Sequence, residues 1–177
     1  MSLTNSPIVK VFICGEGGVG KTTMIERLIH GIFNANTIMT IGVQHSLYKT
    51  TTPKGKDIRL QIWDLGGEER FKVIIPIYVR GSQGGLVVFD ESRFPTFRNL
   101  PDWIQLVKKE LDENAPLLLV STKADLTDGP ALDDETVDDF LEEHGLSAYI
   151  RTSSKTGLNV ETLFDELVKL MDEAGTI

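Results

Sequence analysis

Short apolar runs alternate along the chain with segments in which apolar residues recur every three or four positions. The apolar runs are Val9–Cys14, Leu60–Trp63, Gly85–Phe89, Leu117–Val120 and Ser147–Ile150. Runs that are apolar throughout, rather than at alternate positions, are typical of strands buried on both faces of a parallel sheet. The segments with helical spacing lie between the runs and are Thr22–His30, Phe97–Leu111, Val137–His144 and Val160–Met171. Alternating strands and helices predict an α/β fold with right-handed crossovers.

One pair of strand-like segments has no helix between its members. Gly42–Thr50 is separated from Ile58–Trp63 by a short stretch that contains proline and glycine, and this spacing predicts a hairpin. We therefore expect a six-stranded, mostly parallel sheet with one antiparallel edge strand and about five flanking helices, in a single domain over residues 1–177. At the helix ends we expect Gly145 as a C-cap and Asn159 as an N-cap.

Composition narrows the classes of function. Acidic residues outnumber basic ones by 26 to 18, which gives a net charge of −8. A general nucleic-acid binder is not expected, because phosphate backbones are bound by clustered Lys and Arg. The single cysteine, Cys14, excludes an internal disulfide and a multi-cysteine zinc site, and its place in an apolar run predicts an inert thiol. No apolar run approaches the roughly 20 residues of a membrane-spanning helix, so we expect a cytoplasmic protein.

The most specific motif is Gly-Glu-Gly-Gly-Val-Gly-Lys-Thr at residues 15–22. It fits the phosphate-loop pattern, follows the first apolar run and begins the first predicted helix, a context that disfavours a glycine-rich turn without a ligand. In such a loop, backbone N–H groups surround the nucleotide phosphates, the lysine contacts the β and γ phosphates, and the threonine hydroxyl binds Mg²⁺. The motif and the residue after it predict the nucleotide-binding residues Gly15, Gly17, Gly18, Val19, Gly20, Lys21, Thr22 and Thr23.

Four further motifs follow the phosphate loop in order. They are Thr40-Ile41-Gly42-Val43, Trp63 to Phe71 (Trp-Asp-Leu-Gly-Gly-Glu-Glu-Arg-Phe), Thr122-Lys123-Ala124-Asp125 and Thr152 to Thr156 (Thr-Ser-Ser-Lys-Thr). Together with the phosphate loop, they resemble the motifs of small GTPases of the Ras superfamily over nearly the whole chain. The flanking residues, among them Ile77-Tyr78-Val79-Arg80-Gly81-Ser82, are most similar to the Rab branch. The resemblance implies the P-loop NTPase fold of small G proteins.

The resemblance also implies a magnesium site and a set of catalytic groups around the phosphates. Thr22, Thr40 and Asp64 would bind Mg²⁺, and the place of Asp64 at the end of an apolar strand suits that role better than a turn cap. Gly67 would bring its backbone N–H to the γ-phosphate, a contact that only the triphosphate offers. The implied catalytic residues are Lys21, Thr40, Gly67 and Glu68.

The choice of base follows from the same resemblance. Asp125 would accept hydrogen bonds from guanine N1–H and N2–H₂, a pair that adenine does not offer, so a P-loop kinase or an adenine-specific ATPase is disfavoured. The stem of Lys123 would cover one face of the base, and the ring of Phe33 would lie against it. The implied base-binding residues are Phe33, Thr122, Lys123, Asp125, Ser153, Ser154 and Lys155.

Four positions depart from the family pattern. Glu68 stands where most members have a glutamine that orients the attacking water, and an ionised carboxylate cannot donate a hydrogen bond to the phosphoryl group. Thr37 replaces a tyrosine that closes over the phosphates, which predicts faster nucleotide exchange. Gln44-His45 replaces an Asp-Phe pair of the effector surface, and Thr122 replaces the commoner asparagine, as in the Rho branch.

These features predict a Rab-like GTPase that binds GTP and GDP with Mg²⁺ and acts as a switch in trafficking or signalling. Without an arginine finger, its intrinsic hydrolysis would be slow, on the order of 10⁻⁴ s⁻¹. An alternative, kept open by Glu68, is a guanine-nucleotide binding module with negligible hydrolysis. Expected partners are effectors, exchange factors and GTPase-activating proteins. The last residues contain no cysteine for a prenyl group, so we expect membrane association only where a removed tail or a partner supplies it.

Overall fold

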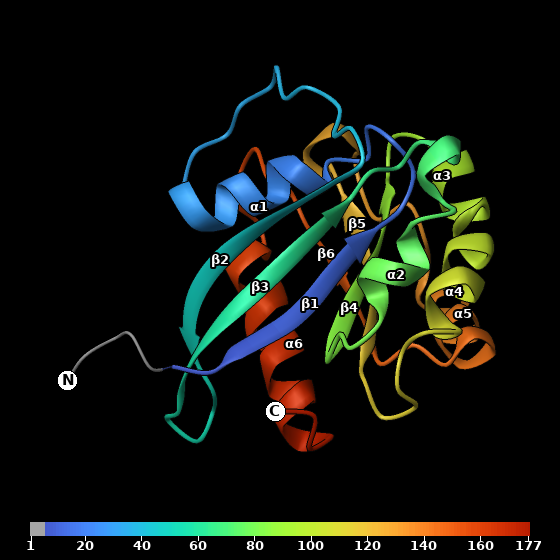
Figure 1. The fold of residues 1–177 in the computed structure, drawn as a ribbon. Helices are drawn as coiled ribbons and strands as arrows, with labels where there is room; N and C mark the ends of the chain where they lie inside the picture. Colours follow the sequence, from blue (N-terminus) through green and yellow to red (C-terminus); the bar gives the residue numbers. More distant parts are fainter. Residues whose placement is uncertain (1–5) are drawn as a thin grey trace.

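The computed structural model describes residues 6–177, and within them six strands form one sheet. The strands are β1 (Ile8–Cys14), β2 (Val43–Thr51), β3 (Asp57–Leu65), β4 (Gly84–Asp90), β5 (Leu117–Thr122) and β6 (Ala148–Arg151). Their order is β2-β3-β1-β4-β5-β6, and β2 runs antiparallel to β3 whereas the other neighbours are parallel (Figure 1). The predicted hairpin and the mostly parallel sheet are confirmed.

Helices cover both faces of the sheet. They are α1 (Lys21–His30), α2 (Ile75–Val79), α3 (Pro95–Arg98), α4 (Leu100–Lys108), α5 (Asp134–His144) and α6 (Val160–Glu173), with short 3₁₀ turns η2 (Glu69–Phe71) and η3 (Ala124–Leu126). Helices α1 and α6 pack on one face, and α2, α3, α4 and α5 pack on the other (Figure 1). With α3 and α4 taken as one interrupted helix, five helices flank the sheet, as predicted. No helix in residues 6–177 is both long enough and apolar enough to span a membrane.

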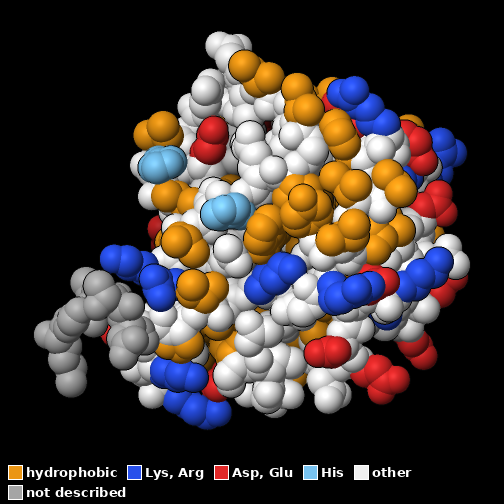
Figure 2. Space-filling model, in the orientation of Figure 1, with side chains coloured by type: hydrophobic (Ala, Val, Ile, Leu, Met, Phe, Trp, Pro, Cys, Tyr) orange, Lys and Arg blue, Asp and Glu red, His pale blue; other side chains and the backbone are white. Residues whose placement is uncertain are grey.

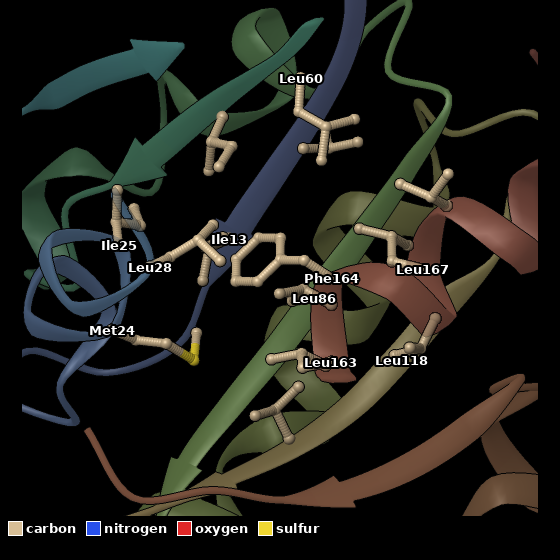
Figure 3. Packing of buried hydrophobic residues seen from close by; sticks show 14 of the residues in the cluster. Ile13, Met24, Ile25, Leu28, Leu60, Leu86, Leu118, Leu163, Phe164 and Leu167 are labelled. Atoms are coloured by element: carbon tan, nitrogen blue, oxygen red, sulfur yellow. The ribbon is translucent and has the colours of Figure 1, made fainter. Parts of the chain in front are cut away.

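Two apolar cores lie on the two faces of the sheet. On one face, Met24 and Leu28 of α1 and Phe164 of α6 pack against the central strands (Figure 3). On the other face, Phe89 of β4 belongs to a cluster that includes Trp103 of α4. All seven residues of β4 are buried, because helices cover this strand from both sides. Burial on both faces explains why its sequence is a continuous apolar run.

Cys14 is the last residue of β1 and is fully buried. Burial raises the pKa of its thiol to about 12, although the positive charge of Lys21 acts in the opposite direction. The thiolate is the reactive form of cysteine, and a thiol with this pKa stays protonated at neutral pH. Cys14 is therefore a core side chain, as predicted.

The helix predicted over Phe97–Leu111 is wrong in its extent. The structure has two helices there, α3 and α4, with only Asn99 between them. Pro95 lies in the first turn of α3 and Pro101 in the first turn of α4. Because proline has no N–H to donate, it suits the start of a helix and interrupts a continuous one. The helical segment consequently begins two residues earlier than predicted and ends at Lys108.

The residues predicted to end α5 and to begin α6 are the C-cap and the N-cap in the structure. Gly145 follows α5 in the left-handed conformation, with φ of 57°, as expected of a C-cap. At the other end of α5, Asp133 is the N-cap and its side chain accepts a hydrogen bond from the Thr136 amide. Asn159 is the N-cap of α6, as predicted, but its side chain makes no cap hydrogen bond and its amide donates instead to the carbonyl of Arg151 (Nδ2–O 2.8 Å).

Candidate functional site

The carboxyl ends of the parallel strands surround a cavity of about 360 Å³. This is the edge of an open α/β sheet at which ligands bind. Its walls are the phosphate loop, the segment between α1 and β2, the start of the segment after β3, and the loops after β5 and β6. The predicted site residues that line it are Gly17, Gly18, Gly20, Lys21, Thr22, Thr23, Phe33, Thr40, Gly67, Thr122, Lys123, Asp125, Ser154 and Lys155.

Five predicted site residues do not line the cavity. Gly15 and Val19 belong to the same phosphate loop as residues that do. Asp64 lies behind two lining threonines, to which it is hydrogen-bonded. Ser153 lies behind the base motif, and its hydroxyl is hydrogen-bonded to the carboxylate of that motif. Glu68 is the exception, because its carboxylate is paired within its own segment.

The backbone of the phosphate loop has its carbonyl and N–H groups in different environments. Lys21 Nζ donates hydrogen bonds to the carbonyl oxygens of Gly15 and Glu16, both at 2.8 Å. Within residues 6–177, no backbone N–H from residue 16 to residue 20 donates to a protein acceptor. Gly20 has φ of 99°, a conformation that glycine adopts without strain, and it leads directly into α1. Free N–H groups at the start of a helix form an anion-binding site.

Lys21 is buried beneath this loop. Burial lowers the pKa of its ammonium group to about 8, while the carboxylate of Asp64 acts in the opposite direction. A phosphate anion beside the ammonium group would favour its charged form, because an opposite charge nearby stabilises the ionised state. The site thus pairs a lysine of reduced basicity with a loop suited to anions.

Three oxygen-bearing side chains converge at the base of the cavity. The Oγ1 atoms of Thr22 and Thr40 are 2.7 Å apart, and Asp64 Oδ2 is hydrogen-bonded to both threonines. Burial raises the pKa of Asp64, an effect opposed by the hydrogen bond from Thr22. Its Oδ1 atom is buried and has no hydrogen-bond partner among the described residues. Hydroxyl and carboxylate oxygens are the ligands that Mg²⁺ prefers, so this donor set fits a magnesium ion.

The base side of the cavity is built on the end of β5. Asp125 Oδ1 accepts a hydrogen bond from Ser153 Oγ at 2.6 Å, which holds one oxygen of the carboxylate in place. Thr122 Oγ1 is hydrogen-bonded to the carbonyl of Val19 at 2.5 Å and to that of Phe89 at 3.1 Å. The threonine therefore joins the phosphate loop, β4 and β5 at one point. These contacts fix the base motif relative to the phosphate loop.

Sequence reasoning missed an ion pair behind the base motif. Arg151 at the end of β6 donates hydrogen bonds to both carboxylate oxygens of Glu91 (Nε–Oε1 2.8 Å, Nη2–Oε2 2.9 Å). Its Nη2 atom also lies within 3.2 Å of the carbonyls of Ala124 and Gly129 and of Thr127 Oγ1. Burial alone would raise the pKa of Glu91, but hydrogen bonds from Arg151 and two hydroxyl groups outweigh it and lower the pKa. The sequence did offer one signal of this pair: Glu91 is a carboxylate directly after the buried strand β4, at the edge of the sheet where ligands bind.

Gly67 and Glu68 follow β3 and have different surroundings. A Cβ atom at Gly67 would lie 2.2 Å from the amide nitrogen of Gly17, so the close approach of the two loops requires glycine here. Glu68 Oε2 is paired with Arg70 Nε at 2.7 Å. The carboxylate is thus engaged by its own segment, whereas Gly67 contacts the phosphate loop.

The segment between α1 and β2 exposes its apolar side chains. Ile38 is 86% exposed and Ile41 is 70% exposed. Thr37 donates a hydrogen bond to the carbonyl of Asn34 at 2.8 Å and lies 3.2 Å from Thr23 Oγ1. Further hydrophobic side chains gather on the same side of the molecule, over β3, β1 and α2 (Figure 2). Burial of apolar area therefore contributes little to holding this segment in place.

His45, one of the departures from the family pattern, lies on β2 beside an aromatic pair. Its ring centroid is 5.0 Å from that of Trp63, and Trp63 is 5.4 Å from Tyr78. The imidazole of β2 therefore extends a row of aromatic side chains that continues through Trp63 of β3 to Tyr78 of α2.

Comparison with known proteins gives the family. The model of the Ras family matches residues 10–173. The chain is 34% identical over 162 residues to "Ras-related protein Rab-13" of Bos taurus, covering 92% of this chain and 79% of that protein. It is 33% identical over 171 residues to "Ras-related protein Rab-8B" of Dictyostelium discoideum, covering 94% and 83%, and 35% identical over 166 residues to "Ras-related protein SEC4" of Saccharomyces cerevisiae, covering 94% and 76%. The chain therefore belongs to the Ras family, and within it to the Rab branch of small GTPases.

Proposed function

We propose that this chain is a single GTP-binding domain that acts as a Mg²⁺-dependent molecular switch and hydrolyses GTP slowly to GDP and phosphate. One observation supports the proposal most directly: the phosphate-loop lysine, the two threonines expected to bind the metal and the base-motif carboxylate all line one cavity. They are Lys21, Thr22, Thr40 and Asp125. A GTP molecule needs these four kinds of group together, since it carries phosphates, a metal ion and a base.

Each part of the site would act on a different part of the nucleotide. The free N–H groups of the phosphate loop and the ammonium group of Lys21 bind the phosphates, and the carboxylate of Asp125 accepts hydrogen bonds from guanine. Thr22, Thr40 and Asp64 would hold a magnesium ion, which would supply positive charge beside the phosphates. Glu68, once released from Arg70, would accept a hydrogen bond from the attacking water.

Membership of the Rab branch supports a role in vesicle trafficking or signalling. In such a role, GTP and GDP would be exchanged and hydrolysed under the control of exchange factors and GTPase-activating proteins, and effectors would bind one nucleotide state. We place the protein in the cytoplasm and at membrane surfaces to which a tail or partner attaches it. The apolar side chains exposed between α1 and β2 suit a surface that changes with the bound nucleotide.

A second candidate is a guanine-nucleotide binding module that hardly hydrolyses. The pairing of Glu68 with Arg70 favours it, because a carboxylate held by a neighbouring guanidinium is less able to orient water. The two candidates share the same binding site and differ only in the fate of bound GTP.

Single-turnover hydrolysis of preloaded GTP with Mg²⁺, in wild type and in Glu68→Gln, distinguishes the candidates. Slow but finite conversion to GDP in wild type supports the switch. Intact GTP over many hours in wild type, with cleavage by Glu68→Gln, supports the binding module. Asp125→Asn tests the base: it is expected to weaken GTP binding selectively, and an unchanged preference for GTP over ATP contradicts the guanine assignment.

A further inference from the structure

The carbonyl oxygens of the phosphate loop are hydrogen-bonded one after another by side chains. Lys21 donates to those of residues 15 and 16, Lys123 Nζ donates to that of Gly18 at 3.0 Å, and Thr122 Oγ1 donates to that of Val19. The carbonyl of Gly17 is bound by Arg93, whose Nη2 atom lies 3.1 Å from it. Arg93 belongs to none of the sequence motifs that identify the family, so its contact with this loop is not explained by them.

Arg93 is held on the loop by a buried carboxylate. Its Nε donates to Asp90 Oδ2 at 3.0 Å, and Lys123 Nζ lies 2.7 Å from the same oxygen. The Asp90 side chain is fully buried, and its other oxygen accepts hydrogen bonds from the amide and hydroxyl groups of Ser92. Burial alone would raise the pKa of Asp90, but hydrogen bonds from Lys123, Ser92 and Arg93 outweigh it and lower the pKa. One ionised carboxylate thus anchors two cations, each of which reaches a different carbonyl of the loop.

The contact has a consequence for the opposite side of the same peptide group. The carbonyl of Gly17 and the N–H of Gly18 belong to one planar peptide, and they point in opposite directions. A cation bound to the oxygen draws electrons from the N–H and makes it a stronger donor. Gly18 lines the cavity, and its N–H is among those without a protein acceptor in residues 6–177.

Glycine on both sides of this peptide makes its orientation easy to change. Gly18 has φ of 75°, and a glycine pair has access to many other backbone conformations. A hydrogen bond from an anchored guanidinium removes that freedom before the ligand binds. Preorganised donors hold a ligand more tightly than donors that must first be ordered.

We propose that Arg93 is a positioning residue for the phosphate loop: held by Asp90, it fixes and polarises the Gly17–Gly18 peptide so that the Gly18 N–H binds a nucleotide phosphate and slows nucleotide release. This inference rests on the proposed function, because it takes the ligand of the cavity to be a guanine nucleotide.

The test compares Arg93→Ala with Arg98→Ala. Both changes remove one arginine from the same segment, but Arg98 is exposed and has no hydrogen bond from its side chain among the described residues. We expect Arg93→Ala to release a fluorescent GDP analogue about tenfold faster than wild type, as for the loss of one charge-assisted hydrogen bond. Release from Arg98→Ala should equal that from wild type. The preference for GDP over ADP should not change in either variant, since Asp125, which would select guanine, is held by Ser153 and by neither arginine.

Two further measurements separate positioning from a general structural effect. The ³¹P resonance of the β-phosphate of bound GDP is expected to shift in Arg93→Ala and to stay in place in Arg98→Ala. Arg93→Lys keeps the charge without a planar fork that reaches both partners, so its release rate should fall between those of wild type and Arg93→Ala. It also provides the comparison if circular dichroism shows that Arg93→Ala does not fold. The Arg93 side chain is 45% exposed, which favours folding of both variants.

Wild-type release rates in Arg93→Ala or Arg93→Lys, with normal GDP binding, would overturn the role of Arg93 and leave the proposed function intact. Equal acceleration in Arg98→Ala would also overturn it, because loss of charge alone would then explain the result. By contrast, a wild-type protein without preference for guanine nucleotides would contradict the proposed function itself.

Discussion

The base side and the switch side of the cavity are held by very different amounts of structure. On the base side, the loops after β5 and β6 are joined through Glu91, which is fully buried, and Arg151, which also binds the backbone after the base motif. On the switch side, the segment between α1 and β2 exposes Ile38 and Ile41, and the Glu68 carboxylate is paired with Arg70, two residues away in the same segment. The two sides of the cavity therefore differ: a buried ion pair holds the base side, whereas the exposed segment on the switch side has little buried apolar contact.

This contrast matches two different tasks. Recognition of a base requires groups that stay in place whichever nucleotide is bound, and a buried hydrogen-bonded network provides that rigidity. Detection of a γ-phosphate requires a segment whose order depends on the ligand. Elements that move are drawn from the least stable parts of a structure, and here the exposed apolar side chains between α1 and β2 mark such a part.

The largest loss of stability is expected from Arg151→Ala, which removes the ion pair between Arg151 and Glu91 on the base side. Removing one partner of a buried ion pair leaves the other charge uncompensated, which typically costs about 3–5 kcal/mol. Because the Arg151 side chain is 26% exposed, we expect the lower end, about 3 kcal/mol of the free energy of unfolding in urea. The matched control is Arg80→Ala, since Arg80 pairs with Glu110 at the surface and should cost about 1 kcal/mol or less. Equal losses in the two variants would contradict the central role of the network.

A smaller effect is expected from Thr122→Val, which removes the link between β5 and the phosphate loop. The carbonyl oxygens of Val19 and Phe89 would lose the one hydroxyl donor that they share, at a cost of about 2 kcal/mol. Urea unfolding measures the loss, and the rate of GDP release should rise because the loop is less well held. Thr156→Val is the control, since within residues 6–177 that exposed hydroxyl makes a single hydrogen bond, which it accepts from the Leu158 amide at 3.3 Å. A Thr122→Val variant as stable as this control would show that the link is not needed.

The stability of the base side should also depend on pH through Glu91. Its folded pKa is lowered, so its contribution is complete above the unfolded value of about 4.3 and is lost as the pH falls through the folded value. We expect the gap in unfolding free energy between wild type and Glu91→Gln to be constant near neutral pH and to shrink in acid. Urea titrations from about pH 7 down to about pH 3 measure this gap. A gap that widens in acid would show the opposite sign of the pKa shift.

The smallest effect is expected on the switch side. Ile38→Ser replaces a side chain that is 86% exposed, so the free energy of unfolding should change by less than about 0.5 kcal/mol. In hydrogen exchange, amides from residue 32 to residue 41 should exchange much faster than those of β5. A large loss of stability in Ile38→Ser, or slow exchange in this segment, would remove the contrast between the two sides.

Sequence patterns predicted the sheet well, because its strands are buried by simple rules. The runs that became β4 and β5 are apolar throughout, and the run that became β1 is interrupted by Lys10 alone. Strands covered on both faces need no other signal. The helix boundaries were less predictable. Apolar spacing marks the buried face of a helix, so it did not reveal that Pro101 begins a new helix.

For the site, sequence motifs predicted the residues that touch a ligand better than those that support them. Lys21 and Asp125 belong to motifs with fixed spacing, and both line the cavity. Arg151 and its partner Glu91 are far apart in the chain, as are Asp90 and Lys123, and these pairs are brought near by the order β4-β5-β6. Charged residues at strand ends are common, so only the folded arrangement shows which of them are paired.

The burial of Cys14 makes the protein convenient for site-specific labelling. It is the only cysteine in the chain, and a thiol with a pKa of about 12 inside the core is protected from maleimide reagents. A cysteine introduced at position 38 could therefore carry a fluorophore or spin label without prior removal of the native thiol. Such a probe would report directly how the exposed segment moves when nucleotide is loaded, cleaved or released.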